Sequence, residues 1–231
     1  MILMQEDLSE IQRESITMIV NKPYSAGAVK HSFWFMEFRK VVSLRCDGLS
    51  WDDIKERNEK ENIFGAPTPL RQNQIWSTVS GRMKCLDDGS GRPLAQEGSP
   101  CSFYPVFQSC DVSAQKLFAL VAAMAYDKLF AEFVYEVIRE KMIIGSNEFA
   151  DSDVRIFFKN KQEQDDKAAK WTEATTKRLG ACYKTMLFEA GLTDKGKDVR
   201  KILKPILDPV MERWLLDHGM EYYVKALTGV R

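Results

Sequence analysis

Apolar residues recur at helical spacing along nearly the whole chain, whereas the strict alternation typical of a half-buried strand is nearly missing. Polar breakers divide the apolar stretches from one another. The segment NKPYSAGA at 21–28, the pair Asp47-Gly48 and Gly145 each end one pattern. These features predict an all-α fold.

Cap residues predict where several helices begin. Ser50 precedes a helix whose first turn carries Asp52 and Asp53, which favour the positive end of the helix dipole. Thr68 followed by Pro69 is a second N-terminal signal, because proline lacks the N–H that a first helical residue leaves unpaired. Further helices are expected over 7–20, 31–46, 111–126, 128–144, from 151 onward and over 172–190, with a final pair interrupted at Gly219.

Three parts are predicted along the chain. Residues 1–22 form an N-terminal polar helix or arm, 23–96 a helical module with a helix-turn-helix-like pair, and 97–231 a helical bundle with a basic C-terminal linker and terminal helices. The boundary is placed in the Gly-, Pro- and Ser-rich loop at 87–105. Three bundle helices, 111–126, 128–144 and 172–190, are expected to pack together and bury Leu117, Leu120, Val121, Phe133, Val137, Leu179, Tyr183 and Leu187.

Composition limits the classes of protein that fit this pattern. The 231 residues include 33 basic and 33 acidic side chains, so any basic surface must be local and balanced elsewhere. The five cysteines form no CxxC pair, which argues against a zinc ribbon and favours reduced thiols. The longest strongly apolar run, 117–126, is half of the roughly 20 residues that span a bilayer. We therefore expect a cytoplasmic protein that does not enter a membrane.

Motifs of catalysis or cofactor binding are missing from the sequence. The two histidines, His31 and His218, lie far apart and belong to no metal-binding pattern, and no phosphate loop, dinucleotide fingerprint or nucleophile elbow occurs. Glu132, Glu136 and Glu140 recur at i, i+4 and i+8 and are expected on a solvated, salt-bridged helix face. The sequence predicts a protein that is not an enzyme and has no cofactor or metal.

Residues 68–84, TPLRQNQIWSTVSGRMK, contain no acidic residue. Arg and Lys bind phosphates and Asn and Gln pair with adenine in the major groove, so this segment is a candidate DNA-binding helix. The alternative is that its polar residues only cover the wet face of an amphipathic helix. The candidate contacts are Arg71, Asn73, Gln74, Ser77, Arg82 and Lys84, with Trp76 and Val79 expected to face inward and Arg82 to stay exposed.

A second basic region strengthens the case for double-stranded DNA as a partner. Two separated basic surfaces on a chain with no net charge suit contact with the phosphate backbone of a duplex. The candidate residues of this region are Lys177, Arg178, Lys195, Lys197, Arg200 and Lys201.

The order of several longer segments resembles a known family. These are KPYSAGAVKHSF, LSWDDIKERNEKENIF, SAQKLFALVAAMAYDKLFAEFVYEVIREKMIIG, DSDVRIFFKNK and TEATTKRLGACYKTMLFEAGL. They resemble the BrxA family of bacteriophage-exclusion (BREX) defence systems, formerly labelled inner-membrane proteins. The resemblance covers about 24–207 and implies a small, soluble, non-enzymatic helical protein, similar in its bundle to the antitermination factor NusB and able to bind DNA.

Two functions follow as hypotheses. The first is a DNA-binding accessory component of a BREX-type phage-defence system, contacting the duplex backbone through basic helix surfaces. The second is a protein–protein scaffold or adaptor that binds other proteins of the same system without touching DNA. The second hypothesis rests on zero net charge and on the expectation that Trp34, Tyr104 and Phe107 are exposed.

Overall fold

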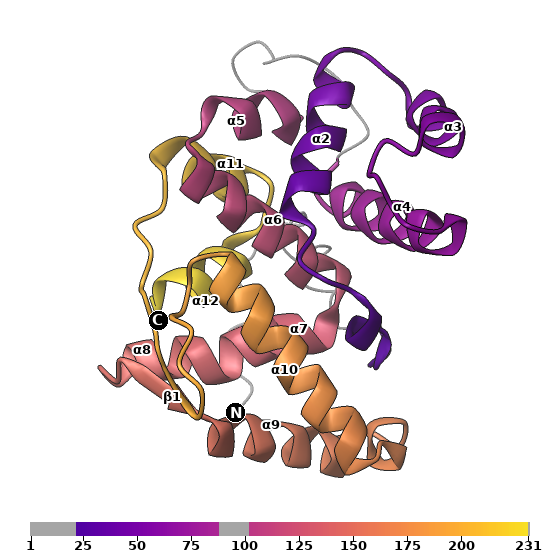
Figure 1. Ribbon diagram of the computed structural model, residues 1–231. Helices are drawn as coiled ribbons and strands as arrows, with labels where there is room; N and C mark the ends of the chain where they lie inside the picture. Colours follow the sequence, from indigo (N-terminus) through magenta and orange to yellow (C-terminus); the bar gives the residue numbers. More distant parts are fainter. Residues whose placement is uncertain (1–21, 88–101, 231) are drawn as a thin grey trace.

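The computed structural model describes residues 22–87 and 102–230, and these form a predominantly helical protein with one small sheet (Figure 1). The predicted all-α class is confirmed, while the expected helix over 7–20 lies outside the described residues. The helices are α2 (Phe35–Cys46), α3 (Trp51–Glu61), α4 (Pro69–Lys84), α5 (Phe103–Ser109), α6 (Val112–Tyr126), α7 (Lys128–Phe133), α8 (Glu140–Ile143), α9 (Asp151–Gln164), α10 (Glu173–Glu189), α11 (Pro209–Asp217) and α12 (Glu221–Thr228). Short turns of 3-10 helix are η1 (Gly27–Lys30) and η3 (Ala168–Lys170).

The predicted caps begin the helices they were assigned to. The Ser50 hydroxyl accepts a hydrogen bond from the Asp53 N–H at 3.1 Å, and the Asp53 carboxylate accepts one from the Ser50 N–H at 3.0 Å. Thr68 likewise accepts from the Arg71 N–H at 3.2 Å at the start of α4. The helix expected from His31 begins only at Phe35, because Trp34 adopts a left-handed backbone conformation with φ of 52°.

The helix expected over 128–144 is not uniform. Between α7 and α8 the backbone widens into a π-helical segment, η2 (Val134–Arg139). The guanidinium of Arg139 donates to the carbonyl of Val230 at 3.1 and 3.0 Å, so this segment is tied to the end of the chain beyond α12.

Two three-residue strands, β1 (Glu148–Ala150) and β2 (Val199–Lys201), pair antiparallel with Phe149 opposite Arg200. The Ile202 N–H extends the pairing by donating to the Asn147 carbonyl at 2.6 Å. Strands this short have too few residues to show an alternating pattern, which is why the sequence did not reveal them.

The predicted packing of α6, the α7–α8 segment and α10 is confirmed, and all eight side chains expected in this core are buried. The ring of Tyr183 on α10 lies 4.7 Å from that of Phe130 and 5.5 Å from that of Phe133, centroid to centroid. The core continues without a break into the N-terminal helices, where α2 packs on α5 and α4 packs on α6. The division of the chain near residue 96 stays a prediction.

The expectation of exposed aromatic side chains is wrong. Trp34, Tyr104 and Phe107 are all buried in the common core. Phe107 packs against Phe38 and Phe118, with ring centroids 5.6 and 6.0 Å apart, so the short helix α5 is held by aromatic contacts.

Candidate nucleic-acid interface

Helix α4 is packed on several sides. It contacts α2, α3 and α6, and its buried stripe is centred on Ile75, Val79 and Met83. Arg82 lies on this stripe, three residues after Val79, and is only 3% exposed. Its guanidinium donates to the carbonyls of Ser32 and Phe33 at 3.0 and 2.8 Å. The expectation that Arg82 stays exposed is therefore wrong, because Arg82 joins α4 to the segment before α2.

The remaining candidate residues of α4 form a weaker basic surface than the sequence indicated. Arg71 is half-buried over the ring of Trp34 at 4.9 Å and donates to the Gln74 amide oxygen at 2.8 Å. Gln74 in turn donates to the Lys30 carbonyl at 3.1 Å. Leu70, in the first turn of α4, is apolar but 82% exposed, so it lies outside the buried stripe of the helix. Asn73, Ser77 and Lys84 do lie exposed. Lys84 is the one exposed cation of this helix, and its ammonium lies 5.2 Å from the centre of the Trp51 ring.

A groove of about 470 Å³ lies between α9 and α10 and carries more positive charge. Arg155 and Lys159 on α9 face Lys177 on α10 across it, and none of these three makes an ion pair with a residue that the structure describes. Lys184 also lines the groove but is paired with Asp151 at 2.5 Å. The two carboxylates of the lining are Asp151 and Glu173. Against them stand four cations, so the lining carries a net charge of +2.

Close contact between α9 and α10 shapes this groove. Gly180 on α10 lies so near α9 that an added Cβ would sit 2.7 Å from the Val154 side chain. The floor is therefore apolar, formed by Val154 and Phe158, while the cations stand at the rim. Arg155 and Lys159 were missed as candidates, although their i, i+4 spacing on α9 beside the apolar residues was visible in the sequence.

The hairpin that carries the predicted C-terminal basic residues packs against α10. Arg200 donates to the Lys184 carbonyl at 3.0 Å, which fixes the hairpin around β2 beside one end of the groove. The Asp194 carboxylate accepts from the Gly196 and Lys201 N–H groups, and these bonds lower the pKa of Asp194. The exposed cations of this hairpin are Lys195, Lys197 and Lys201, and the Lys195 ammonium lies 6.0 Å from the centre of the Phe188 ring.

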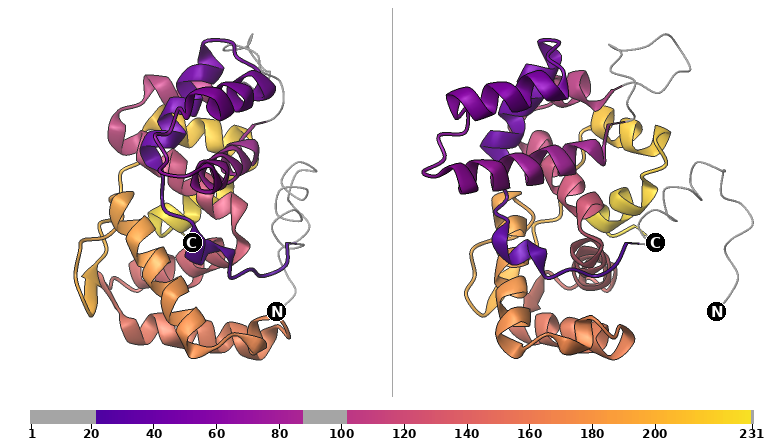
Figure 2. Two further views of the ribbon diagram at one scale, coloured as in Figure 1. Left: turned by 45° about the vertical axis from the view of Figure 1, so that its right-hand side comes forward. Right: turned by 90° about the vertical axis from the view of Figure 1, so that its right-hand side faces the viewer.

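The two predicted basic regions do not form one surface. All views place α4 in the upper half of the molecule, and α9 with the part of α10 that lies along it at the lower end (Figures 1 and 2). The groove lies between these two helices. Lys177 lines the α9–α10 groove, whereas the exposed Arg178 lines a different hollow, between α10 and the segment after η1. The structure therefore separates Arg178 and the α4 residues from the groove and its adjoining hairpin.

The carboxylates of the α7–α8 segment are not simply a solvated face. Lys161 of α9 is 4% exposed, and its ammonium lies 2.6 Å from both Glu132 and Glu136. The Tyr24 hydroxyl donates to Glu132 at 2.6 Å, so the network also holds the start of the described chain. Burial acts to lower the pKa of Lys161, but its hydrogen bonds to the two glutamates outweigh burial and raise it.

Asp127 and His31, whose pKa values Arg82 influences, should make stability change with pH in opposite directions. Burial raises the pKa of Asp127 to about 6, whereas burial, together with Arg82, Lys30 and Arg71, lowers the pKa of His31 to about 4. Stability from Asp127 is present below its unfolded pKa of about 3.8 and is lost as pH rises through about 6. Stability from His31 is present above about 6.5 and is lost as pH falls through about 4.

When pH is lowered from 7 to 4.5, we expect the free energy of unfolding of His31→Gln to rise relative to that of the wild type, because the variant has no imidazole to protonate. Over the same change, the free energy of unfolding of Asp127→Asn should fall relative to that of the wild type, because the variant has no carboxylate to neutralise. Urea unfolding of the three proteins at both pH values measures this difference, and groups common to all three cancel in the comparison. A His31→Gln variant that follows the wild type at both pH values would contradict the assigned pKa of His31.

Two other kinds of feature are missing from the part of the chain that the structure describes. Among residues 22–87 and 102–230 no three His, Cys, Asp or Glu side chains are grouped so that they could hold a metal ion. Within the same ranges, no helix is both long and apolar enough to cross a bilayer.

Comparison with known proteins gives the family. The model of the BrxA family matches residues 22–219. A curated protein of Bacillus cereus (strain H3081.97), BREX protein BrxA, is 32% identical over 212 residues, which are 92% of this chain and 100% of that protein. A crystal structure of an uncharacterized protein from Magnetospirillum magneticum superposes with a TM-score of 0.67 at 16% identity, over 90% of this chain and all of the other, which shows a shared fold.

Proposed function

The chain belongs to the BrxA family of BREX phage-defence components, and from this we propose that it is a non-enzymatic accessory protein that binds double-stranded DNA. The cations of the α9–α10 groove and the adjoining hairpin contact the phosphate backbone. In this proposal the other proteins of the same defence system supply the chemistry and are its protein partners.

The observation that carries the proposal is the set of unpaired cations at the rim of the groove. Arg155, Lys159 and Lys177 have no carboxylate partner among the described residues, so their charge is available to phosphates. Lys195, Lys197 and Lys201 continue the positive surface beyond the Lys184–Asp151 pair. A rim of long cationic side chains over an apolar floor suits a polyanion that lies across it.

Backbone contact fits better than base reading. A helix that recognises bases in the major groove of DNA needs free hydrogen-bond donors on its exposed face. On α4, however, Gln72 and Arg82 are buried and the Gln74 side chain already donates to the Lys30 carbonyl. Asn73, Ser77 and Lys84 remain as an exposed edge that can assist through phosphate contacts. We therefore expect binding that depends strongly on salt and weakly on sequence.

The test is a triple variant of the groove, Arg155→Ala/Lys159→Ala/Lys177→Ala. Each phosphate contact contributes about 0.9 to the slope of log K against log salt, so the slope should flatten by about three and low-salt affinity should fall roughly a hundredfold or more. Fluorescence anisotropy of labelled duplexes over a salt series measures both quantities.

A matched control removes the same charge from α3. Lys55, Arg57 and Lys60 are exposed and paired with glutamates on their own helix, so their replacement by alanine should leave the slope almost unchanged. If the control variant loses as much affinity as the groove variant, the helix-turn-helix-like pair is the contact surface. If the wild type shows no salt-sensitive binding at low ionic strength, the protein does not work by binding DNA.

The second candidate function is a scaffold within the same defence complex. One of its two original supports, zero net charge, remains, whereas the other, exposed aromatic side chains, is wrong. Exposed isoleucines on α9 and on the linker after β2 provide a further support. Co-purification with other proteins of the system that survives nuclease treatment, together with unchanged affinity in the groove variant, would favour the scaffold.

A further inference from the structure

Helix α10 carries acidic side chains only at its two ends. Glu173 is its first residue and Glu189 its last, and residues 174–188 include no aspartate or glutamate. The most outward face of this stretch follows helical spacing, at i, i+4, i+7 and i+11. Its residues, called the α10 ridge below, are Ala174, Arg178, Ala181 and Thr185.

The α10 ridge stands between two recesses in the surface. Helix α10 contacts α9 on one side and η1 on the other. Ala181 lines both the α9–α10 groove and a hollow of about 340 Å³ between α10 and the segment after η1. A helix with a recess along each side projects from its surroundings, whereas α4 is enclosed by three other helices.

Unpaired cations border the ridge on both sides. Arg155, Lys159 and Lys177 stand on the side of α9. On the other side Arg178 lines the hollow, and Lys30 is exposed in the segment that forms its far wall. Neither Arg178 nor Lys30 makes an ion pair with a residue of the described chain. Cations on both sides of a projecting helix can reach the phosphates of both strands of one duplex.

The dimensions of α10 fit the major groove of DNA. An α-helix with its side chains is about 10–12 Å across, the major groove is about 12 Å wide and the minor groove only about 6 Å. Ala174, Ala181 and Thr185 are short, so the helix can approach the base edges closely, and the two recesses leave room for the phosphate strands that border the groove. Short side chains offer few hydrogen bonds to bases, which agrees with weak dependence on sequence.

We propose that the α10 ridge enters the major groove of the duplex. Arg155, Lys159 and Lys177 then bind phosphates of one strand, and Arg178 with Lys30 binds phosphates of the other. This inference rests on the proposed function and adds which element enters the duplex and which groove receives it.

An acidic residue on the ridge tests whether the ridge enters DNA. Ala181→Glu should weaken binding of a labelled duplex roughly tenfold or more at constant salt, because the new carboxylate lies between two phosphate strands. Thr185→Glu, one turn further along α10, should act in the same direction. Both side chains are exposed, so the variants should keep the fold.

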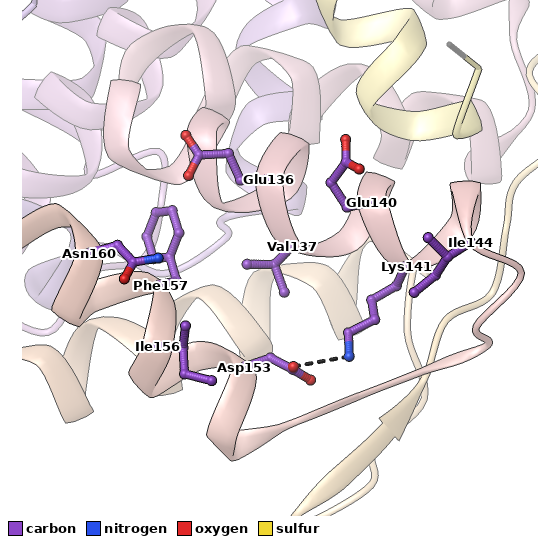
Figure 3. Close-up of a pocket in the computed structure, with 9 residues that line it drawn as sticks. All are labelled: Glu136, Val137, Glu140, Lys141, Ile144, Asp153, Ile156, Phe157 and Asn160. Carbon is purple, nitrogen blue, oxygen red and sulfur yellow. Dashed lines mark ion pairs between the residues drawn. The ribbon is translucent and has the colours of Figure 1, made fainter.

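A matched control adds the same charge to the opposite face of α9. Asn160 is exposed there and lines a separate hollow with residues of η2 and α8 (Figure 3). The carboxylates of this hollow are already paired within the chain, as Glu136–Lys161, Glu140–Arg139 and Asp153–Lys141. Asn160→Glu should change affinity by less than about twofold, since salt screens a charge outside the contact.

Modified DNA identifies the groove. A duplex whose cytosines carry glucosylated 5-hydroxymethyl groups has a bulky, uncharged substituent in the major groove, where the C5 position of pyrimidines lies. This duplex should lose most of its affinity for the protein. Netropsin, which fills the minor groove of A·T tracts, should not compete.

The outcomes separate this inference from the proposed function. If the triple groove variant loses affinity while Ala181→Glu and Thr185→Glu match Asn160→Glu, the protein binds DNA through the rim alone and the ridge stays outside. Unchanged affinity for the glucosylated duplex, or competition by netropsin, also overturns the inference and leaves the proposed function standing. A wild type without salt-sensitive binding to duplex DNA overturns both.

Discussion

Replacing Arg82 by alanine should lower the free energy of unfolding by about 3 kcal/mol, because the change leaves the buried Phe33 carbonyl and the partly buried Ser32 carbonyl without their donor. The guanidinium bonds the Ser32 and Phe33 carbonyls and lies 3.9 Å from the Met186 sulfur, so it connects α4, the segment before α2 and α10. Burial also lowers the pKa of Arg82 to about 10, which leaves it charged at neutral pH. Urea unfolding measures the loss.

Arg71→Ala is the control for this prediction. Arg71 is only half-buried, and its partners can turn to water, so its loss should cost less than about 1 kcal/mol. If Arg82→Ala instead kept full stability and lost affinity for DNA, Arg82 would be a DNA contact as the sequence indicated. The comparison therefore separates a core arginine from a binding arginine on the same helix.

Lys161→Met should destabilise the fold by about 2–3 kcal/mol, because Glu132 and Glu136 then lose the ammonium that both of them bind. The Glu132 side chain is 17% exposed and also touches Lys128 at 3.8 Å, so part of its charge remains balanced. Removing a second charge should relieve the repulsion. We expect Lys161→Met/Glu132→Gln to recover more than half of the loss, and a thermodynamic cycle of the four proteins measures the coupling.

The double variant also tests how Lys161 acts. If the losses of stability in Lys161→Met and Glu132→Gln simply add in the double variant, Lys161 contributes by packing its stem and not by its charge.

The sequence by itself determined most of the helices, the main core and the family, but not the late start of α2, the π-helical segment η2 or the short helix α5. Caps such as Ser50, Thr68 and Asp111 are local features, since in each the side chain accepts a hydrogen bond from the backbone N–H three residues further on. Helical periodicity likewise placed residues such as Leu117 and Tyr183 in the core, because an apolar stripe must be buried whatever its partner is. These properties need no knowledge of which helices meet.

Only the tertiary structure decided which charges are available. Arg82 and Lys161 carry the same charge as Lys159 and Lys177, yet the first two are buried among partners far along the chain and the last two are exposed. Whether a cation on a helix is free depends on which neighbouring helix supplies carbonyls or carboxylates, and such contacts join residues up to about a hundred positions apart. The candidate groove exists because α9 and α10 meet closely at Gly180, a contact between helices that no local pattern encodes.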